Sequence, residues 1–407
     1  MRFKLLSTAL LASLVFTATA GAQPSLLFDI KTGEVLQHQE AFRRWHPASL
    51  TKLMTAYTTF RAIDAGDLTL QSPIRVSRRA AGLPPAKMGY PAGSVVTLDN
   101  ALKIIMVKSA NDIAMAIGEN VGGSQAGFAA RMNAEARRLG MTGSHWVNPH
   151  GLHDPEQYTT ARDLAVLVRA IRTEYPQYER FFNIDAIVSG KTMMKTFNTL
   201  MGRFPGADGM KTGFVCASGF NLVGSASRDG HTLAAIVLGA ENPAARAEQA
   251  AKMLLEGFDH RPPGAVQLAG LAPYGEKQGE PTDMRPIVCA PHNAAAASDG
   301  PQPAKPTDAP QEGAVVQAPP PSLLAELGPA QHIETVSLGG ATGPVPKAMQ
   351  DEKGNAVADV PIPEWRPDLP PPTGGEPLAQ GDQMDEGAPL PQASPTGRGD
   401  RLVRQPG

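Results

Sequence analysis

Apolar residues recur at helical spacing along most of the first 260 residues. The stretch HPASLTKLMTAYTTFRAIDAG predicts a helix that begins near Pro47 and Ser49 and stops before Gly66. In TLDNALKIIMVKSANDIAMAIGENVGG the period is interrupted near Ser109, which predicts two helices, the second closed by a Gly-Gly pair. The same pattern predicts helices over about 124–139, 160–172 and 244–255.

Strand patterns lie at both ends of this region. The runs SLLFDI and EVLQHQ flank a turn at Lys31 to Gly33, and the runs GFNLVGSAS and HTLAAIVLGA flank a turn that contains Asp229 and Gly230. A further strand that contains Lys211 to Gly213 precedes the second pair. This order predicts an α+β fold in which strands from both ends of the region pair in one antiparallel sheet flanked by helices.

The composition changes near residue 260. Of the 38 prolines, 11 precede this point, and after residue 263 only Tyr274 and Trp365 are aromatic. A segment so poor in large apolar groups cannot offset the entropy of ordering a chain. We therefore expect a folded domain over 23–262, a short docked extension over 263–290 that packs as short strands, and a largely disordered Pro/Ala-rich tail over 291–407.

The first 22 residues have the features of a secretory signal. Arg2 and Lys4 precede an apolar run from Leu5 to about Phe16, and small residues follow up to Ala22. The run is too short for a stable membrane span, although an uncleaved anchor is the alternative. We expect a protein that is exported by a cleaved signal peptide to the periplasm or the cell envelope.

The two cysteines and the charge balance limit the other classes of function. In an exported chain the pair Cys216 and Cys289 favours a disulfide, worth about 4 kcal/mol by loop closure, over two independent thiols. The formal net charge is −2, with acidic and basic residues mixed. This balance gives no indication of nucleic-acid binding or of strong membrane electrostatics.

Ser49 and Lys52 form an S-x-x-K motif at the predicted start of a helix, where a three-residue separation brings both side chains onto one face. A serine hydroxyl needs a base within hydrogen-bond reach to act as a nucleophile, and a partly desolvated lysine can be that base. The helix N-terminus adds N–H groups where an oxyanion would develop. Taken alone, the motif is also that of a capping serine followed by a surface lysine.

Two further motifs follow in order. Ser109 and Asn111 interrupt two helices, where a hydroxyl can relay a proton and an amide can hold a carbonyl, although such residues also simply favour helix junctions. Lys211 to Gly213 lies on a strand, where a cation and a hydroxyl can bind a carboxylate and glycine allows close backbone approach. The other K-T-G, at Lys31, precedes Ser49 and is interpreted as a turn.

The order S-x-x-K, S-x-N, K-T-G resembles the signature of the penicillin-recognising serine enzymes. The contexts PASLTKLMTAY, SANDIAMAIGE, NPHGLHD and DGMKTGF look specifically like low-molecular-mass penicillin-binding proteins that act as serine-type D-alanyl-D-alanine carboxypeptidases. The resemblance covers about 24–258. It implies a β-lactamase/transpeptidase-like fold, with a five-stranded antiparallel sheet flanked by helices plus a helical subdomain, and it implies no cofactor or metal.

The resemblance also implies catalytic roles. Ser49 would be the acylated nucleophile and Lys52 its base, although which group takes the proton is disputed for related enzymes. Ser109 would relay a proton to the leaving amine, and Asn111 would orient the peptide. The backbone N–H groups of Ser49 and Phe214 would form the oxyanion hole.

The substrate-binding residues follow from the same resemblance. Lys211 and Thr212 would face the terminal carboxylate of the substrate. Gly213, on the same strand, would allow close approach to the backbone. Arg246, in ENPAARAEQAAKMLL, matches an arginine that helps to bind this carboxylate. The alternative for Arg246 is a solvated helix residue.

His145, His150, His153 and Asp154 form a cluster that invites a zinc assignment. The H-x-x-H pair lies between two prolines with Gly151 inside it, so no regular helix aligns the imidazoles, and we assign no metal. His150 matches a loop histidine that affects deacylation in the carboxypeptidases. A purely structural loop histidine is the alternative.

The expected function is removal of the terminal D-alanine from peptidoglycan pentapeptide stems, with β-lactam antibiotics as covalent inhibitors, and hence a role in cell-wall organisation and cell shape. The main alternatives are an endopeptidase or transpeptidase of the same fold, a β-lactamase, and a non-catalytic cell-wall scaffold. No E-x-x-L-N segment lies between Asn111 and Lys211, which disfavours a class A β-lactamase.

The C-terminal region departs from the family. Many such carboxypeptidases have a second, β-rich domain and an amphipathic C-terminal helix that anchors them to a membrane. Here the end PTGRGDRLVRQPG has no apolar face, so we do not expect membrane attachment by that route. A partner of the Pro-rich tail is left open.

Overall fold

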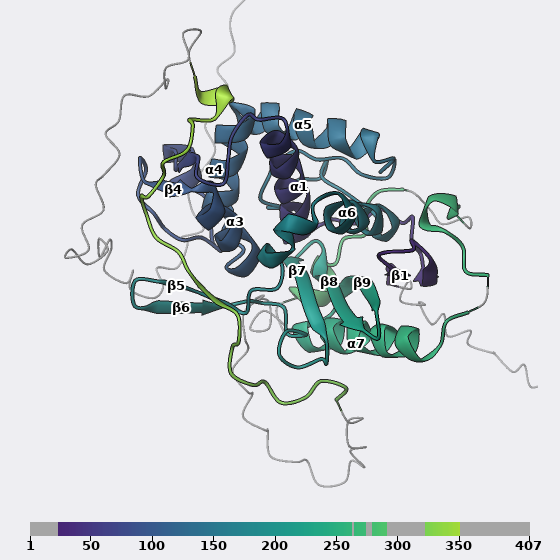
Figure 1. Ribbon diagram of the computed structural model, residues 1–407. Coiled ribbons are helices and arrows are strands. Elements are labelled where there is room, and N and C mark those ends of the chain that lie inside the picture. The colour runs from purple at the N-terminus through teal and green to yellow at the C-terminus, as the bar shows by residue number, and fades with distance from the viewer. Residues whose placement is uncertain (1–22, 263, 274–278, 291–321, 351–407) are drawn as a thin grey trace, which may run out of the picture. The chain divides into compact units, whose positions relative to one another are not determined.

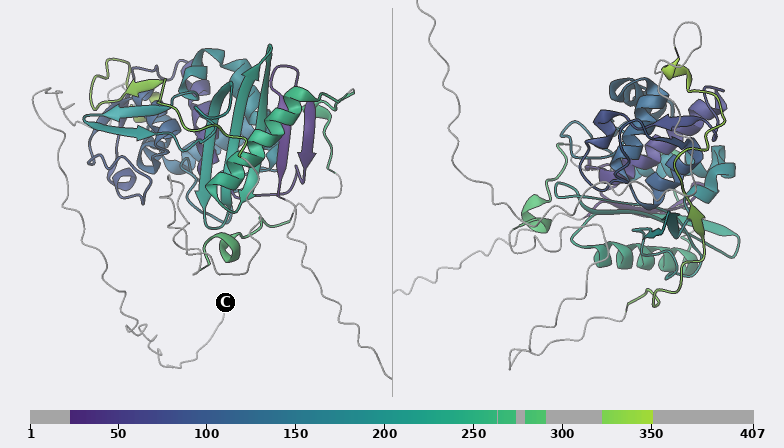
Figure 2. Two further views of the ribbon diagram at one scale, coloured as in Figure 1. Left: turned by 90° about the horizontal axis from the view of Figure 1, so that it is seen from below. Right: turned by 90° about the vertical axis from the view of Figure 1, so that its left-hand side faces the viewer.

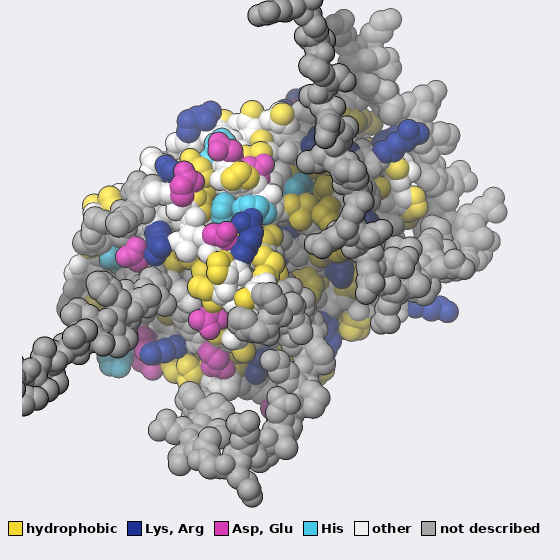
Figure 3. Space-filling model, turned by 180° about the vertical axis from the view of Figure 1, so that it is seen from behind, with side chains coloured by type: hydrophobic (Ala, Val, Ile, Leu, Met, Phe, Trp, Pro, Cys, Tyr) yellow, Lys and Arg dark blue, Asp and Glu magenta, His cyan; other side chains and the backbone are white. Residues whose placement is uncertain are grey.

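The computed structural model describes residues 23–262, 264–273, 279–290 and 322–350 (Figure 1). The predicted signal peptide over 1–22 lies outside these ranges, as do 291–321 and 351–407 of the predicted tail. Among the residues described, no helix is both long enough and apolar enough to span a membrane. On the face shown in Figure 3, acidic and basic side chains lie interspersed.

The predicted antiparallel sheet is confirmed, with five strands in the order β2-β1-β9-β8-β7. Each neighbouring pair is antiparallel, and Ser25 lies opposite Val237 where the N-terminal hairpin joins the C-terminal strands. The strands are β1 (Ser25–Asp29), β2 (Val35–Gln39), β7 (Ala207–Val215), β8 (Gly219–Arg228) and β9 (His231–Ala240).

Helices cover both faces of this sheet. Helix α7 (Pro243–Asp259) lies on one face, and α1 (Thr51–Asp64) and α6 (Ala161–Glu174) lie on the other (Figure 2). Along β1, Leu26 and Phe28 belong to the core under α1 and α6, whereas Leu27 belongs to the core under α7. The alternation follows the two-residue period of a strand and explains why β1 is a continuous apolar run.

The predicted helices are confirmed, and side-chain caps account for several of their starts. Thr97, Ser124, Thr160 and Asn242 each accept a hydrogen bond from the backbone N–H three residues ahead, which satisfies an otherwise unpaired donor. Gly123 closes one helix in the left-handed conformation. The helical subdomain contains α3 (Leu98–Val107), α4 (Asn111–Gly122) and α5 (Gln125–Arg138).

Several short elements have no clear sequence pattern. Strands of three or four residues contain too few alternating positions to be recognised. A parallel strand from the C-terminal region, β10, pairs with β5 at the edge of a small second sheet. The short elements are β3 (Pro73–Arg75), α2 (Arg78–Ala81), β4 (Val95–Thr97), η2 (Pro176–Phe181), β5 (Ala186–Ser189), β6 (Thr192–Lys195) and β10 (Ile333–Thr335).

The extension after α7 is joined to the domain by a disulfide between Cys216 and Cys289, whose Cα atoms are 5.7 Å apart. Over 264–273 and 279–290 it forms short helical turns, η3 (Leu268–Gly270) and α8 (Arg285–Val288), and a single bridge at Gln267 instead of the expected short strands. Prolines near the turns limit strand pairing here.

Residues 322–350, which lie within the predicted tail, pack on the domain. Leu324 and Val336 are buried, and Glu334 forms an ion pair with Lys103 on α3 at 2.9 Å. The backbone of β10 pairs with β5, so this segment obtains its hydrogen bonds from a strand edge that already exists. Isolated apolar residues are sufficient for such docking, and no periodic pattern is needed.

The turn that contains the first K-T-G is held by Asp29. Its Oδ1 accepts hydrogen bonds from the N–H groups of Lys31 and Thr32, both at 3.0 Å, while Arg261 and His231 bind Oδ2. Gly33 adopts the left-handed conformation, φ +78°. The interpretation of this K-T-G as a turn is confirmed.

Asp29 should make the stability of the domain depend on pH. Burial alone raises the pKa of this carboxyl, but hydrogen bonds from Thr32, Arg261 and His231 outweigh burial and lower its pKa below the ordinary value of 3.8. The ionised form therefore stabilises the fold above pH 3.8, and this contribution disappears as the pH falls through the lowered pKa.

Urea unfolding of wild type and Asp29→Asn between pH 3 and 7 measures this contribution. We expect the difference in unfolding free energy to be largest near pH 7 and to shrink at acidic pH. A difference that stays constant over the whole range would contradict the assignment to the ionised carboxylate.

Candidate active site

Ser49 lies in a short 3-10 turn, η1 (Ala48–Leu50), that leads directly into α1. Its side chain is half-buried, whereas Lys52 in the first turn of α1 is fully buried. The Nζ atom of Lys52 lies 3.0 Å from Ser49 Oγ, so the three-residue spacing does bring the two groups together. Ala48 is held in the left-handed conformation, φ +48°, a costly backbone state for a residue with a Cβ atom.

The amine of Lys52 is bound on three sides. Besides Ser49 Oγ, it donates to Asn111 Oδ1 at 2.9 Å and to the His150 carbonyl oxygen at 2.5 Å. An ammonium has three N–H donors to match these acceptors, and a neutral amine would have a lone pair that can accept the Ser49 hydroxyl proton. The arrangement is therefore compatible with movement of a proton between Ser49 and Lys52.

The S-x-N motif forms the junction of α3 and α4. Ser109 is in the left-handed conformation, φ +60°, and Asn111 is the first residue of α4. The backbone N–H of Asn111 donates to the carbonyl oxygen of Ala86 at 2.7 Å, and its side-chain Nδ2 donates to the carbonyl oxygen of Pro84 at 3.1 Å. The preceding loop therefore fixes the orientation of the Asn111 side chain. The interruption seen in the sequence is a strained turn that places two polar side chains.

The second K-T-G lies on β7, beside Ser49. Lys211 is buried, and its Nζ atom donates to Ser109 Oγ at 3.0 Å. A Cβ atom on Gly213 would lie 2.9 Å from the carbonyl oxygen of Pro47 and 3.0 Å from the backbone nitrogen of Ser49. Glycine is required here because the backbone of β7 packs directly on the segment that carries Ser49. This segment, residues 46–50, is called the nucleophile turn after the predicted role of Ser49.

The three motifs therefore meet in one place. Lys52 bonds to Asn111, 59 residues away, and Lys211 bonds to Ser109, 102 residues away. Ser109 and Asn111 are separated by one residue, so they connect the Ser49 side of the site to the β7 side. Thr212 is buried on the same strand, and Phe214 follows Gly213 and stacks on Phe220 with ring centroids 4.2 Å apart.

His150 contacts Lys52 through its backbone carbonyl oxygen. Burial, with smaller contributions from the charges of Lys52 and Arg79, lowers the pKa of His150 to about 3. The ring Nδ1 lies 3.1 Å from the N–H of Leu152, a group that can only donate, so Nδ1 is the acceptor. The imidazole is therefore neutral at neutral pH.

Arg246 is 1 % exposed on α7, which excludes the alternative of a solvated helix residue. Its guanidinium donates to the carbonyl oxygens of Asn221 at 3.4 Å and Phe197 at 3.3 Å and lies over the ring of Phe220. Asn221 lies on β8 opposite Gly213, so Arg246 contacts the strand that is paired with the K-T-G strand.

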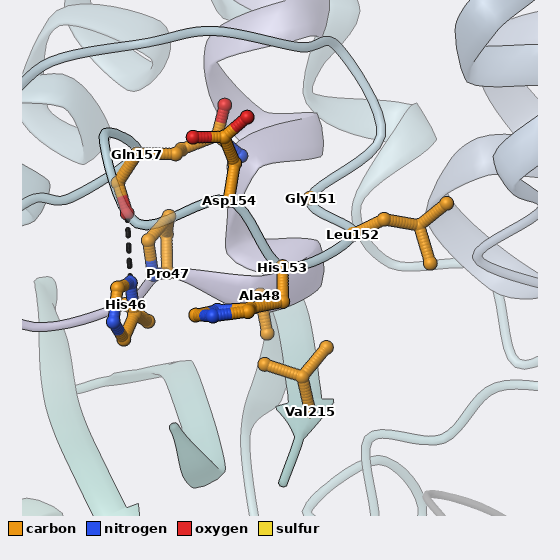
Figure 4. Close-up of a pocket in the computed structure, with 9 residues that line it drawn as sticks. All are labelled: His46, Pro47, Ala48, Gly151, Leu152, His153, Asp154, Gln157 and Val215. Atoms are coloured by element: carbon orange, nitrogen blue, oxygen red, sulfur yellow. Dashed lines mark hydrogen bonds between the residues drawn. The ribbon is translucent and has the colours of Figure 1, made fainter. Parts of the chain in front are cut away.

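The remaining histidines of the predicted cluster, His145 and His153, have different partners. His145 bonds through Nδ1 to the carbonyl oxygen of Glu156, while the ring of His153 meets His46 edge to face at 4.7 Å. Within the described ranges, no group of three potential ligands is placed to hold a metal ion. A pocket beside the nucleophile turn (Figure 4) is lined by His46, Pro47, Ala48, Gly151, Leu152, His153, Asp154, Gln157 and Val215.

Two buried amides that are not among the predicted site residues, Gln157 and Asn221, hold the nucleophile turn. Gln157 accepts a hydrogen bond from His46 through its backbone oxygen, shown dashed in Figure 4, and its Nε2 donates to Thr51 Oγ1 at 3.2 Å. Asn221 binds the turn from the sheet side. The available signal for Asn221 is an amide inside the apolar run GFNLV, because a buried polar side chain needs partners.

A family model described as D-alanyl-D-alanine carboxypeptidase (Peptidase_S11) matches residues 13–242, more than half of the chain. D-alanyl-D-alanine carboxypeptidase DacC of Escherichia coli is 33% identical over 244 residues, or 58% of this chain and 61% of that protein. DacD of Salmonella typhimurium is 35% identical over 239 residues, or 57% of this chain and 61% of that protein. The chain thus spans about three fifths of these relatives.

Solved structures have the same fold. Penicillin-binding protein 6B of Escherichia coli superimposes with a TM-score of 0.56 at 32% identity, covering 58% of this chain and 77% of that one. Penicillin-binding protein D2 of Listeria monocytogenes, solved with ampicillin bound, gives 0.54 at 27% identity, covering 58% and 97%. With its three motifs assembled in one site and this family match, the chain belongs to the D-alanyl-D-alanine carboxypeptidase family of penicillin-binding proteins.

Proposed function

We propose that this protein is an exported serine peptidase that removes the terminal D-alanine from peptidoglycan pentapeptide stems through an acyl-enzyme on Ser49. The observation that carries the proposal is the contact of Ser49 Oγ with a buried lysine amine at 3.0 Å, in the order of motifs typical of the family. Family membership supports the reaction class, and the N-terminal signal pattern supports export to the periplasm or cell envelope.

In acylation, Ser49 Oγ attacks the carbonyl carbon of the last peptide bond while Lys52 takes its proton. The negative charge that develops on the carbonyl oxygen is stabilised by the backbone N–H groups of Ser49 and Phe214. The C–N bond then breaks, and the leaving amine receives a proton relayed by Ser109. D-alanine departs, and the ester on Ser49 remains.

Substrate orientation is assigned to the β7 side of the site. Lys211 and Thr212 bind the terminal carboxylate of the substrate, and Arg246 adds positive charge one strand away. Asn111 holds the peptide carbonyl while its own amide is fixed by Lys52 and Pro84. With these roles, the reacting peptide bond of the substrate would lie between Ser49 and Phe214.

Water then attacks the ester with Lys52 as the base, which returns a proton to Ser49 Oγ. His150 contributes through its carbonyl oxygen, which holds the Lys52 amine at 2.5 Å. Its ring is neutral at neutral pH, because burial lowers the pKa of the imidazole to about 3. β-Lactams acylate the same serine and inhibit the enzyme. The partners of the Pro-rich tail stay open, and we assign no cofactor.

Release of D-alanine from a pentapeptide that ends in D-Ala-D-Ala tests this function. We expect stoichiometric release by wild type and, because the nucleophile is lost, a fall of more than about 10³-fold for Ser49→Ala. Cleavage of cross-linked dimers without release would instead indicate an endopeptidase. Rapid hydrolysis of penicillin would indicate a β-lactamase. Equal labelling of wild type and Ser49→Ala by a fluorescent penicillin would show that the assignment of Ser49 as the nucleophile is wrong.

A further inference from the structure

Asn221 binds the segment that carries the nucleophile to the central sheet. It is fully buried on β8, directly opposite Gly213 of β7. Its Nδ2 donates to the carbonyl oxygens of His46 at 3.0 Å and Pro47 at 3.3 Å. Its Oδ1 accepts from the N–H of Gly239 on β9 at 2.9 Å, so one side chain joins three segments of the chain.

The sheet is irregular at this position. Phe220 pairs with Ala240 and Leu222 with Val237, so two residues of β9 lie opposite Asn221, which is a β-bulge. The N–H of Gly239, in the left-handed conformation at φ +77°, bonds to the Asn221 side chain. Bulges are frequent next to active sites, where they redirect a side chain.

The bulge also fits the segment that leads to the nucleophile. A Cβ atom on Gly239 would lie 2.2 Å from the ring of Trp45, the residue before His46. The indole N–H of Trp45 donates to the carbonyl oxygen of Ser218 at 2.8 Å. Trp45 and Asn221 thus attach consecutive residues of one segment to the same part of the sheet.

This attachment matters because the two proposed oxyanion donors lie on different elements. The N–H of Ser49 is on η1, and the N–H of Phe214 is on β7, next to Gly213. Gly213 permits close approach of the two elements, but an absent side chain cannot hold them together. The Asn221 amide supplies a directional bond to Pro47, two residues before Ser49, from the strand paired with β7.

We propose that Asn221 is a positioning residue that sets the separation of the two oxyanion N–H groups by fixing the nucleophile turn against the sheet. The inference rests on the proposed function. Asn221 bonds to backbone atoms of the turn and the bulge, so it acts through them. The left-handed Ala48 needs such restraint, because an unrestrained turn would relax to a cheaper backbone conformation.

The test uses Asn221→Ala and Asn221→Ser in the full chain, and the control is Asn120→Ala. Asn120 is also a buried amide that joins backbone segments, through Nδ2 to Ala116 at 2.7 Å and to Arg75 at 2.9 Å. It therefore reports the cost of losing a buried hydrogen-bonded amide outside the site. All variants are compared below their melting temperatures, and Asn221→Ser serves if the alanine variant does not fold.

Three quantities are measured: the acylation rate constant with a fluorescent penicillin, the dissociation constant of the preceding noncovalent complex, and affinity for a peptide boronic acid that forms a tetrahedral adduct with Ser49. For both Asn221 variants we expect acylation to slow by about 10²-fold, because loss or misplacement of an oxyanion donor has this effect. Boronic acid affinity should fall in parallel, whereas noncovalent binding should change less than about threefold. Asn120→Ala should acylate at the wild-type rate.

If penicillin labelling depends on Ser49 but the folded Asn221 variants are acylated at a rate within about threefold of wild type, the positioning role of Asn221 alone is overturned. An equal loss for Asn120→Ala would also overturn it, because the effect would then be one of general stability. Labelling of Ser49→Ala at the wild-type level would overturn the proposed function and this role together.

Discussion

Replacement of Lys52 by methionine is expected to slow acylation by a penicillin by at least about 10³-fold, within the range that general base catalysis contributes. Methionine has a similar length and keeps the apolar packing of the fully buried stem, but it has no nitrogen to take the Ser49 proton. Lys52 Nζ lies within hydrogen-bond distance of Ser49 Oγ, at 3.0 Å.

This change also removes the partner of Asn111 Oδ1 and of the His150 carbonyl, so a loss of stability of about 1–3 kcal/mol per unsatisfied acceptor is expected. Lys103→Met is the matched control, since Lys103 is a nearly buried lysine paired with Asp99 and Glu334. It should lower stability and leave acylation unchanged. Acylation by Lys52→Met within tenfold of wild type would refute Lys52 as the base.

Replacement of Gly151 by alanine is expected to destabilise the domain by roughly 3–5 kcal/mol, from overpacking and a left-handed conformation together. Gly151 has φ +88°, and a Cβ atom there would lie 1.9 Å from the carbonyl oxygen of Ala48 and 3.0 Å from the nitrogen of Ser49. The loop cannot withdraw without pulling the His150 carbonyl away from Lys52, so acylation should be lost as well.

Gly140→Ala separates the two causes, because Gly140 has φ +71° and no atom within 4 Å of the added Cβ. This control should cost only about 1–2 kcal/mol, the price of the left-handed conformation. Urea unfolding measures both variants, and labelling with a fluorescent penicillin reports acylation. If Gly151→Ala were no less stable than Gly140→Ala, the close packing of this loop on the nucleophile turn would be wrong.

The amino-acid sequence was sufficient for the main elements and for the order of the motifs. Helical periods and caps such as Thr97 and Thr160 are local features, so each helix is specified within its own segment. The three-residue spacing of Ser49 and Lys52 is also local, and it predicts their contact directly. The distinction between the two K-T-G copies followed from their order and from the turn at Lys31.

Only the tertiary structure decided which distant groups meet. Nothing in a linear pattern links Lys211 to Ser109, or shows that His150 presents its carbonyl to Lys52 while its ring stays neutral. The same holds for the docking of 322–350, where two buried apolar residues and a strand edge replace a periodic pattern.

Asn221 shows the reason most clearly. The sequence by itself determined that Asn221 lies on a strand, inside an apolar run, and in which order the three motifs occur. The bulge at Gly239 and the carbonyl groups of His46 and Pro47, which lie 18, 175 and 174 residues away, decided what that amide does. Local propensities act over a few residues, whereas burial and hydrogen bonding are settled by whatever the folded chain brings into contact.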